Sequence, residues 1–130
     1  MYGIFVNENG GVPYAKLIVQ GYKKVETRSR NMLKDLTHTR VAIVRTRRGK
    51  MPTVVGYADI GEAYFCPVER FNDEDVRNLT CIPVGSKYDC HGKGKWFYDM
   101  WDAEQCNPYP LPSSAIRHGR SWCEFNLEEV

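Results

Sequence analysis

Hydrophobic residues along the chain come in short runs separated by turn-forming clusters, and most runs are too short for long helices. Continuous apolar or β-branched runs predict strands at Tyr2–Val6, Arg40–Thr46 and Thr53–Ile60. The last two flank the basic turn Arg47–Pro52, so they predict a hairpin. Gly56, inside the return strand, indicates a bulge or a close backbone approach.

Weaker patterns complete the set of predicted elements. Ala63–Cys66 is expected to continue the return strand, and Trp96–Trp101 and Ser121–Leu127 are expected to form strands. Prolines and glycines predict a loop at Cys81–Lys95 and an irregular segment at Asn107–Gly119.

Two segments have helical features. Pro13–Gln20 carries Leu17 and Ile18 for packing, begins with a proline and is followed by Gly21, which suits the left-handed residue that ends a helix. Within Pro67–Thr80, an Asn72 or Asp73 N-cap and early acidic residues predict a second short helix. No repeated βαβ pattern occurs, so we predict an α+β, mostly β fold. It would be a small barrel of about five to seven strands, mostly antiparallel, with two to three short helices, as one domain over residues 1–130.

Composition excludes several classes of protein. The 130 residues are 42% hydrophobic and 26% charged, which is ordinary for a globular domain, and no apolar run approaches the roughly 20 residues needed to span a bilayer. No secretion signal is visible at Met1–Val6, so we expect a cytoplasmic protein with no membrane partner. The five cysteines are scattered without a Cys-x-x-Cys pair, which favours reduced thiols and no metal site. We also expect no cofactor.

The charge is unevenly divided. The chain has a net charge of +2, but residues 1–60 hold eleven Lys and Arg against four Asp and Glu, whereas residues 61–130 hold seven against twelve. A basic half suits a polyanionic partner such as nucleic acid, because clustered cations release counterions when they meet phosphates. Charges that mix on a folded surface would give the same count, so charge alone leaves both interpretations open.

The stretch Gly21–Arg28 concentrates candidate chemistry directly after the first predicted helix. If it is extended, Lys24, Glu26, Arg28 and Arg30 share one face. Lys23 lies in the turn. Lysine and arginine can bind phosphate or carbonyl oxygens, and a carboxylate can accept from a base edge.

These residues form the motif Gly-x-Lys-x-x-Glu-x-Arg, in which Gly21, Lys23, Glu26 and Arg28 keep their full spacing. With this motif and the later strands, the chain resembles the ASCH domain, a branch of the PUA-like β-barrel superfamily. The resemblance covers nearly the whole chain, with 31–39 and 67–95 matched least. It implies a cleft that holds RNA or a nucleotide-like ligand.

The resemblance implies a set of candidate site residues. For ligand binding these are Lys23, Glu26, Arg28, Tyr64, Trp96, Tyr98 and Trp122, the aromatic members as base-stacking platforms. For phosphate contacts we add Lys24, Arg30, Arg45, Arg47, Arg48 and Lys50.

Relatives with amidohydrolase activity on N4-acylated cytidine carry a threonine where this chain has Glu26, so the family's nucleophile is absent here. If the protein is an enzyme, Lys23 and Glu26 are the candidate catalytic residues, with water as nucleophile, and Asp59 and Glu62 are possible further acids or bases. We favour an RNA- or modified-nucleoside-binding module. An amidohydrolase, a ribonuclease and a protein-interaction domain remain as alternatives, and the oligomeric state is open.

Overall fold

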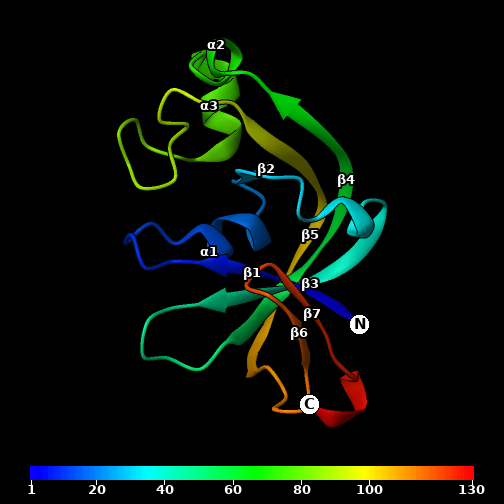
Figure 1. The fold of residues 1–130 in the computed structure, drawn as a ribbon. Coiled ribbons are helices and arrows are strands. Elements are labelled where there is room, and N and C mark those ends of the chain that lie inside the picture. Colours follow the sequence, from blue (N-terminus) through cyan, green and yellow to red (C-terminus); the bar gives the residue numbers. More distant parts are fainter.

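One mixed sheet of seven strands runs through the computed structural model, which covers residues 1–130 (Figure 1). The strands are β1 (Tyr2–Asn7), β2 (Val25–Arg28), β3 (Thr39–Thr46), β4 (Thr53–Cys66), β5 (Lys95–Pro110), β6 (Ile116–His118) and β7 (Trp122–Glu124). Their order across the sheet is β2-β5-β4-β3-β1-β7-β6. Neighbours are antiparallel except β1 and β3, which pair in parallel.

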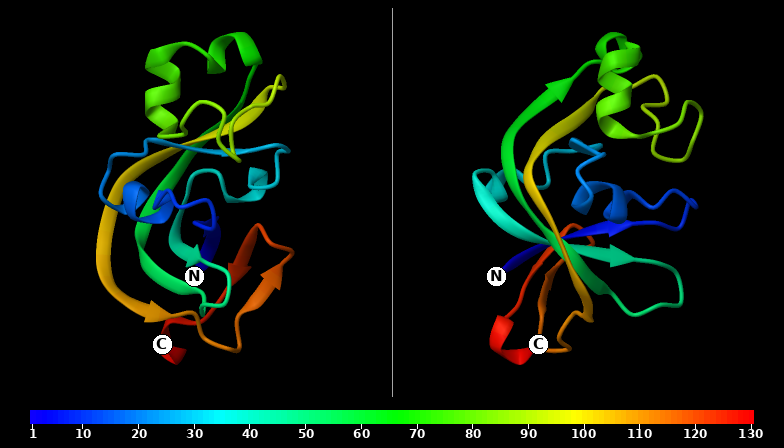
Figure 2. Two further views of the ribbon diagram at one scale, coloured as in Figure 1. Left: turned by 90° about the vertical axis from the view of Figure 1, so that its left-hand side faces the viewer. Right: turned by 180° about the vertical axis from the view of Figure 1, so that it is seen from behind.

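The sheet coils without closing into a hydrogen-bonded barrel. Strands β4 and β5, of 14 and 16 residues, are long enough to curve through the whole molecule (Figure 2). The backbone ladder nevertheless ends at β2 on one side and β6 on the other. Strand β2 has four residues, and its link across the open side to β1 is a side-chain bond from Arg28 Nη2 to the Phe5 carbonyl at 2.6 Å. The mostly-β fold is confirmed, whereas full barrel closure is corrected to a coiled open sheet.

The predicted hairpin of β3 and β4 is present, and β4 continues without a break to Cys66. The ladders shift register beside Gly56. A Cβ on Gly56 would lie 2.1 Å from the Glu104 carbonyl oxygen and 2.6 Å from Val19 Cγ1, so this position requires a close backbone approach.

Strand β5 is longer than predicted. It extends through Pro108 and Pro110, into the segment expected to be irregular. Strand β2 pairs with β5 only between residues 96 and 99, so the far end of β5 has β4 on one side and no strand on the other. Proline is tolerated there because an edge position does not need its missing N–H. At the C-terminus, β7 is shorter than the predicted Ser121–Leu127.

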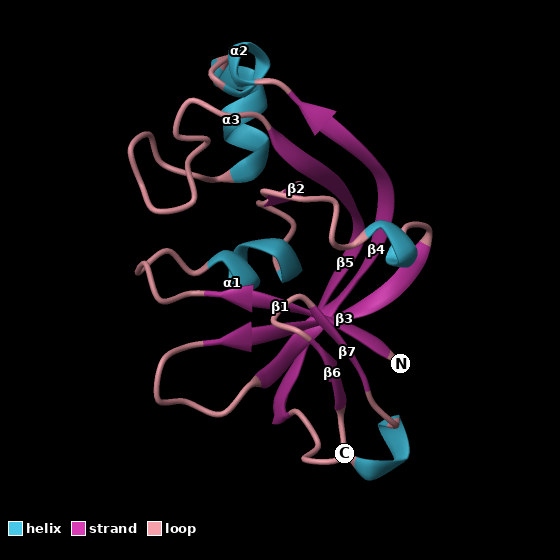
Figure 3. Ribbon diagram, in the orientation of Figure 1, coloured by secondary structure: helices cyan, strands magenta, loops and turns pink.

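The helices are short. They are α1 (Tyr14–Val19), α2 (Val68–Phe71) and α3 (Glu74–Thr80), with 3-10 turns at Lys34–Leu36 and Leu127–Glu129. Figure 3 shows α2 and α3 together at one end of the sheet and α1 nearer its middle. Gly21 has a φ of 80° and donates its N–H to the Ile18 carbonyl, as expected for the residue that ends a helix. No helix has the length and apolar character needed to cross a membrane.

A main core of 21 buried residues lies between α1 and the sheet, and a smaller one of 7 lies on the opposite face of β1 and β3, where Phe5, Ala42 and Val44 alternate with residues of the main core. Burying Ile18, Val19 and Ala15 of α1 against the sheet fixes the helix, and therefore fixes where the chain emerges at Lys23.

Candidate functional site

A cavity of about 750 Å³ opens on the side of the molecule where β2 and the end of β1 meet the loops. Its walls come from six parts of the chain. They are the end of β1, the start of α1, the segment 23–32, the β3–β4 hairpin tip, the loop 82–95 and β6 with the turn that follows it. The volume is within the range of pockets that hold small ligands.

Lys23 lies at the base of this cavity with 1% of its surface exposed. Its ammonium donates to the Thr80 carbonyl at 2.5 Å, lies 3.7 Å from Glu26 Oε1 and lies 4.9 Å from the centroid of the Tyr14 ring. Burial lowers the pKa of Lys23, and the neighbouring Glu26 carboxylate opposes that shift in part.

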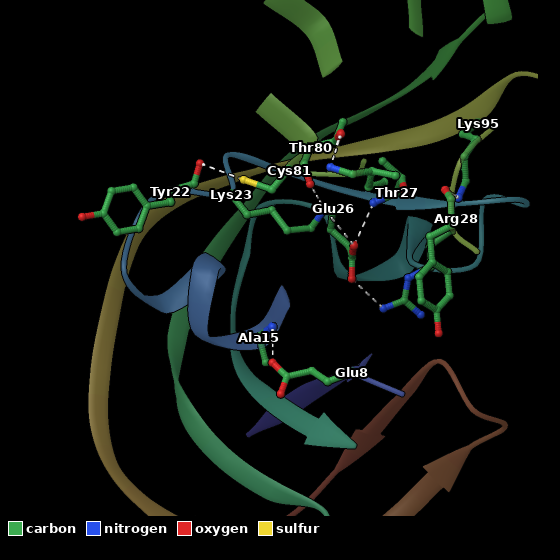
Figure 4. Close-up of polar contacts among 12 residues, drawn as sticks. Glu8, Ala15, Tyr22, Lys23, Glu26, Thr27, Arg28, Thr80, Cys81 and Lys95 are labelled. Atoms are coloured by element: carbon green, nitrogen blue, oxygen red, sulfur yellow. Dashed lines mark hydrogen bonds and ion pairs between the residues drawn. The ribbon is translucent and has the colours of Figure 1, made fainter. Parts of the chain in front are cut away.

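Glu26 lies between the two cations of the motif (Figure 4). Its Oε1 accepts the Thr27 backbone N–H at 2.9 Å, and its Oε2 accepts from Arg28 Nη2 at 3.2 Å. Burial by itself would raise the pKa of Glu26, but Arg28, Lys23 and the Thr27 N–H together hold it below its ordinary value. The carboxylate is therefore ionised and already engaged.

Arg28 is held by a single terminal nitrogen. Its Nη2 bonds both the Phe5 carbonyl and Glu26, while Nη1 and Nε have no acceptor within the protein. Because the side chain lines the cavity and is oriented by two acceptors, it can offer its remaining donors to a ligand as a fixed fork.

The lining is strongly cationic. Nine Lys and Arg side chains line the cavity against two acids, Glu26 and Asp89. The cations are Lys23, Arg28, Arg47, Arg48, Lys87, Lys93, Lys95, Arg117 and Arg120. Since the whole chain has a net charge of only +2, folding gathers the positive charge at this one place.

The second acid, Asp89, is compensated inside the protein. It forms a 2.9 Å ion pair with Arg77 and also accepts the N–H groups of Gly85 and Cys90. Burial opposes its ionisation, yet these partners lower the pKa of Asp89 to about 2. Asp89 therefore fixes the loop 82–95 and adds little negative charge to the cavity.

Some predicted phosphate-contact residues reach the cavity and others do not. Arg47 and Arg48 line it from the hairpin tip. Lys24, Arg30, Arg45 and Lys50 are not part of its lining. Strand alternation did not predict the place of Lys24, because β2 begins only at Val25 and the Lys24 backbone N–H bonds the Leu79 carbonyl of α3.

None of the four aromatic residues predicted to stack on a base lines the cavity. Tyr98 is fully buried, and its hydroxyl donates to Asn31 Oδ1 at 2.9 Å, so it has a structural role. Tyr64 donates to Asp99. Trp96 packs edge-on against Phe65, and Trp122 stacks on His118 with ring centroids 3.8 Å apart.

The aromatic residues in the lining are instead Phe5, Tyr14 and Tyr88. Phe5 and Tyr14 are buried, and Tyr88 is half-buried. Tyr88 belongs to the loop that matched the family motif least, and that loop also brings Lys87, Lys93 and Lys95. The three lysines at 87, 93 and 95 were the only feature of the sequence that indicated a basic site in this loop. Nothing in the local sequence indicated that the loop would fold over β2.

The candidate catalytic residues Lys23 and Glu26 lie together at the base of the cavity, 3.7 Å apart. Thr27 also lines the cavity, but its hydroxyl has no hydrogen bond to either of them. Asp59 and Glu62 lie outside the cavity, at a separate shallow hollow, where Asp59 pairs with Arg40 at 3.0 Å.

Comparison with known proteins identifies the fold. No family model matches the chain, and no curated protein matches it. Among solved structures, an ASCH protein from Zymomonas mobilis is similar at 21% identity, with a TM-score of 0.73 over 98% of this chain and 90% of that one. Two mutants of the same protein match with TM-scores of 0.71 and 0.72, over 90% and 92% of their chains. The coiled sheet and its short helices therefore have the ASCH fold, as the Gly21, Lys23, Glu26 and Arg28 motif predicted.

Proposed function

We propose that the cavity binds single-stranded RNA or a nucleotide derived from it. The observation that carries this proposal is the convergence of nine cationic side chains from separate segments on one cavity with two acids. Phosphate groups are the ligands that such a lining suits best, because each contact releases counterions and is reinforced by hydrogen bonds.

Both acids are compensated by the protein, which strengthens the argument. Glu26 is engaged by Arg28 and Lys23, and Asp89 is engaged by Arg77. A ligand entering the cavity therefore meets an excess of positive charge, and an anionic ligand is favoured over a neutral or cationic one.

A flexible strand or a mononucleotide suits the cavity better than a duplex does. The bases of an unpaired strand can turn away from their neighbours and enter a pocket, which paired bases cannot do without melting. The half-buried ring of Tyr88 offers such a base an aromatic neighbour, and the cations of the hairpin tip and the β6–β7 turn lie along the same lining for the backbone.

Binding is favoured over hydrolysis by the state of Glu26. A general base must be free to accept a proton near neutral pH, whereas Glu26 has a lowered pKa and two hydrogen-bonded partners. We therefore assign Glu26 to orienting Arg28.

The test is the affinity of a fluorescein-labelled 12-nucleotide RNA for a double variant, Arg48→Ala with Arg120→Ala. Both arginines are exposed and line the cavity, so their loss should leave folding intact. We expect Kd to rise about tenfold, since two exposed charge contacts of about 0.7 kcal/mol each give that factor. Fluorescence anisotropy measures the change.

Arg30→Ala is the matched control, because Arg30 is exposed and basic but does not line the cavity. An equal loss of affinity in this control would mean that binding depends on net charge and does not use the cavity. Absence of any RNA binding by the parent protein at 50 mM salt would overturn the proposal outright.

A further inference from the structure

Four charged side chains at the base of the cavity, which we call the floor, are not balanced in charge. The floor consists of Lys23, Glu26, Arg28 and Lys95, all buried or nearly so: Lys23, Glu26 and Lys95 are 1%, 7% and 8% exposed, and the side chain of Arg28 is 14% exposed. It holds three cations and one carboxylate, which leaves two positive charges in excess.

Lys95 is the member of the floor with no acidic partner. Its ammonium donates to the Tyr88 carbonyl at 2.8 Å, and no carboxylate lies within ion-pairing distance. Asp89 is close in sequence to Tyr88 but is already paired with Arg77. Burial lowers the pKa of Lys95, and Arg28 adds to that shift while Glu26 opposes it.

Buried charge without a counter-charge is costly, and proteins keep it where a ligand or a metal supplies the missing sign. Glu26 cannot neutralise the floor by itself, because one carboxylate faces three cations. A ligand group carrying two negative charges would complete the balance.

We propose that the floor binds a phosphomonoester, meaning the terminal phosphate of an RNA end or of a mononucleotide. Such a group carries close to two negative charges at pH 7, whereas an internal phosphodiester carries one. This inference rests on the proposed function and narrows it: the cavity takes the end of a strand, and the rim cations hold the nucleotides that follow.

The donors of the floor suit that group. Arg28 has Nη1 and Nε free for two parallel bonds to phosphate oxygens, and its orientation is fixed by Glu26 and the Phe5 carbonyl. Lys95 is the first residue of β5, and its side chain lies near Arg28 in Figure 4. Its hydrogen bond to the Tyr88 carbonyl connects it to the loop that forms one wall of the cavity.

The experiment compares three forms of one six-nucleotide RNA at pH 7.5: with a 5′-phosphate, with a 3′-phosphate and with hydroxyls at both ends. We expect one of the phosphorylated forms to bind at least about tenfold more tightly than the hydroxyl form by calorimetry. Lys95→Met should remove this preference and leave weak binding of all three. Lys95→Arg should restore it, and Lys34→Met, at an exposed lysine outside the cavity, should leave it unchanged.

Equal affinity for the three RNAs in the parent protein would overturn the inference and leave the proposed function standing. Failure of all three to bind would overturn both. Inorganic phosphate serves as a fourth probe: if it binds as tightly as the phosphorylated RNA, the floor is a small-anion site and the assignment to a strand end is wrong. Circular dichroism of Lys95→Met shows whether the variant is folded, so that a lost preference for phosphorylated RNA is not confused with unfolding.

Discussion

Glu26 illustrates how one residue of the motif acts mainly on its neighbours. It neutralises part of the charge of Lys23 and Arg28, accepts the Thr27 N–H and thereby holds Arg28 against the Phe5 carbonyl. The motif marks Glu26 as a ligand contact, but in the structure Glu26 orients Arg28, and Arg28 is the residue that can bind the ligand. A buried carboxylate in this role is costly to remove, because its partners remain buried without it.

We expect Glu26→Gln to lower the free energy of unfolding by about 3 kcal/mol at pH 7, since the isosteric amide leaves buried cations without their counter-charge. Urea denaturation measures the loss. Glu62→Gln is the control, because that side chain is 72% exposed, and its effect should stay within about 0.5 kcal/mol.

The parent protein and Glu26→Gln can also be compared as a function of pH. The pKa of Glu26 is lowered in the folded state, so its contribution to stability is present above its ordinary pKa and is lost as pH falls through the lowered value. The difference in stability between the parent protein and Glu26→Gln should therefore shrink when urea denaturation is repeated in acid. A difference that stays constant from neutral pH to pH 2 would contradict this assignment.

At the scale of elements, α1 sets the position of the motif and Gly56 sets the position of α1. Val19 at the end of α1 packs where a Cβ on Gly56 would be, and the Glu104 carbonyl of β5 lies close to the same point. The absence of a side chain at Gly56 thus allows a helix and two strands to meet, and Lys23 follows four residues after Val19.

Gly56→Ala should therefore destabilise the protein by about 3 kcal/mol, the upper part of the range for overpacking, because one of the clashing groups is backbone. Thermal unfolding followed by circular dichroism measures the shift. Gly10→Ala is the matched control, since nothing lies within 4 Å of a Cβ at Gly10. A Tm for Gly56→Ala equal to that of the control would show that β5 and α1 can move apart without cost.

At the scale of the whole molecule, folding separates the charge. Nine of the chain's 18 Lys and Arg line one cavity together with only two of its 16 Asp and Glu. The sequence shows a basic half and an acidic half, but Lys87, Lys93, Lys95, Arg117 and Arg120 of the cavity come from the acidic half. The cavity is therefore a product of topology more than of local composition.

This arrangement predicts a strong salt dependence. For a single strand, the logarithm of the binding constant falls with the logarithm of salt concentration by about 0.7 for each phosphate contacted. We expect the Arg48→Ala and Arg120→Ala double variant to reduce that slope by about 1.4, and Arg30→Ala to leave it unchanged. Anisotropy titrations at four salt concentrations measure the slopes, and equal slopes for the parent and the double variant would exclude these arginines from the RNA contact.

Local patterns in the sequence determined the features that depend on neighbouring residues. The β-branched runs predicted β3 and the start of β4, Gly21 predicted the end of α1, and strand alternation placed Glu26 and Arg28 on one face. These features follow from backbone preferences and from the two-residue period of a strand, so they are readable without a structure. The ASCH fold was predicted by the resemblance that the Gly21, Lys23, Glu26 and Arg28 motif carries.

Only the tertiary structure decided which distant residues join them. Tyr98 lies in the main core, where its hydroxyl bonds Asn31, and Lys95 joins Lys23 and Arg28 because the pairing of β5 with β2 brings the start of β5 beside the end of β2. Packing between distant segments fixes the first outcome and strand pairing fixes the second, and no local pattern encodes either. The sequence by itself therefore determined the motif, and the fold determined the charge of the cavity around it.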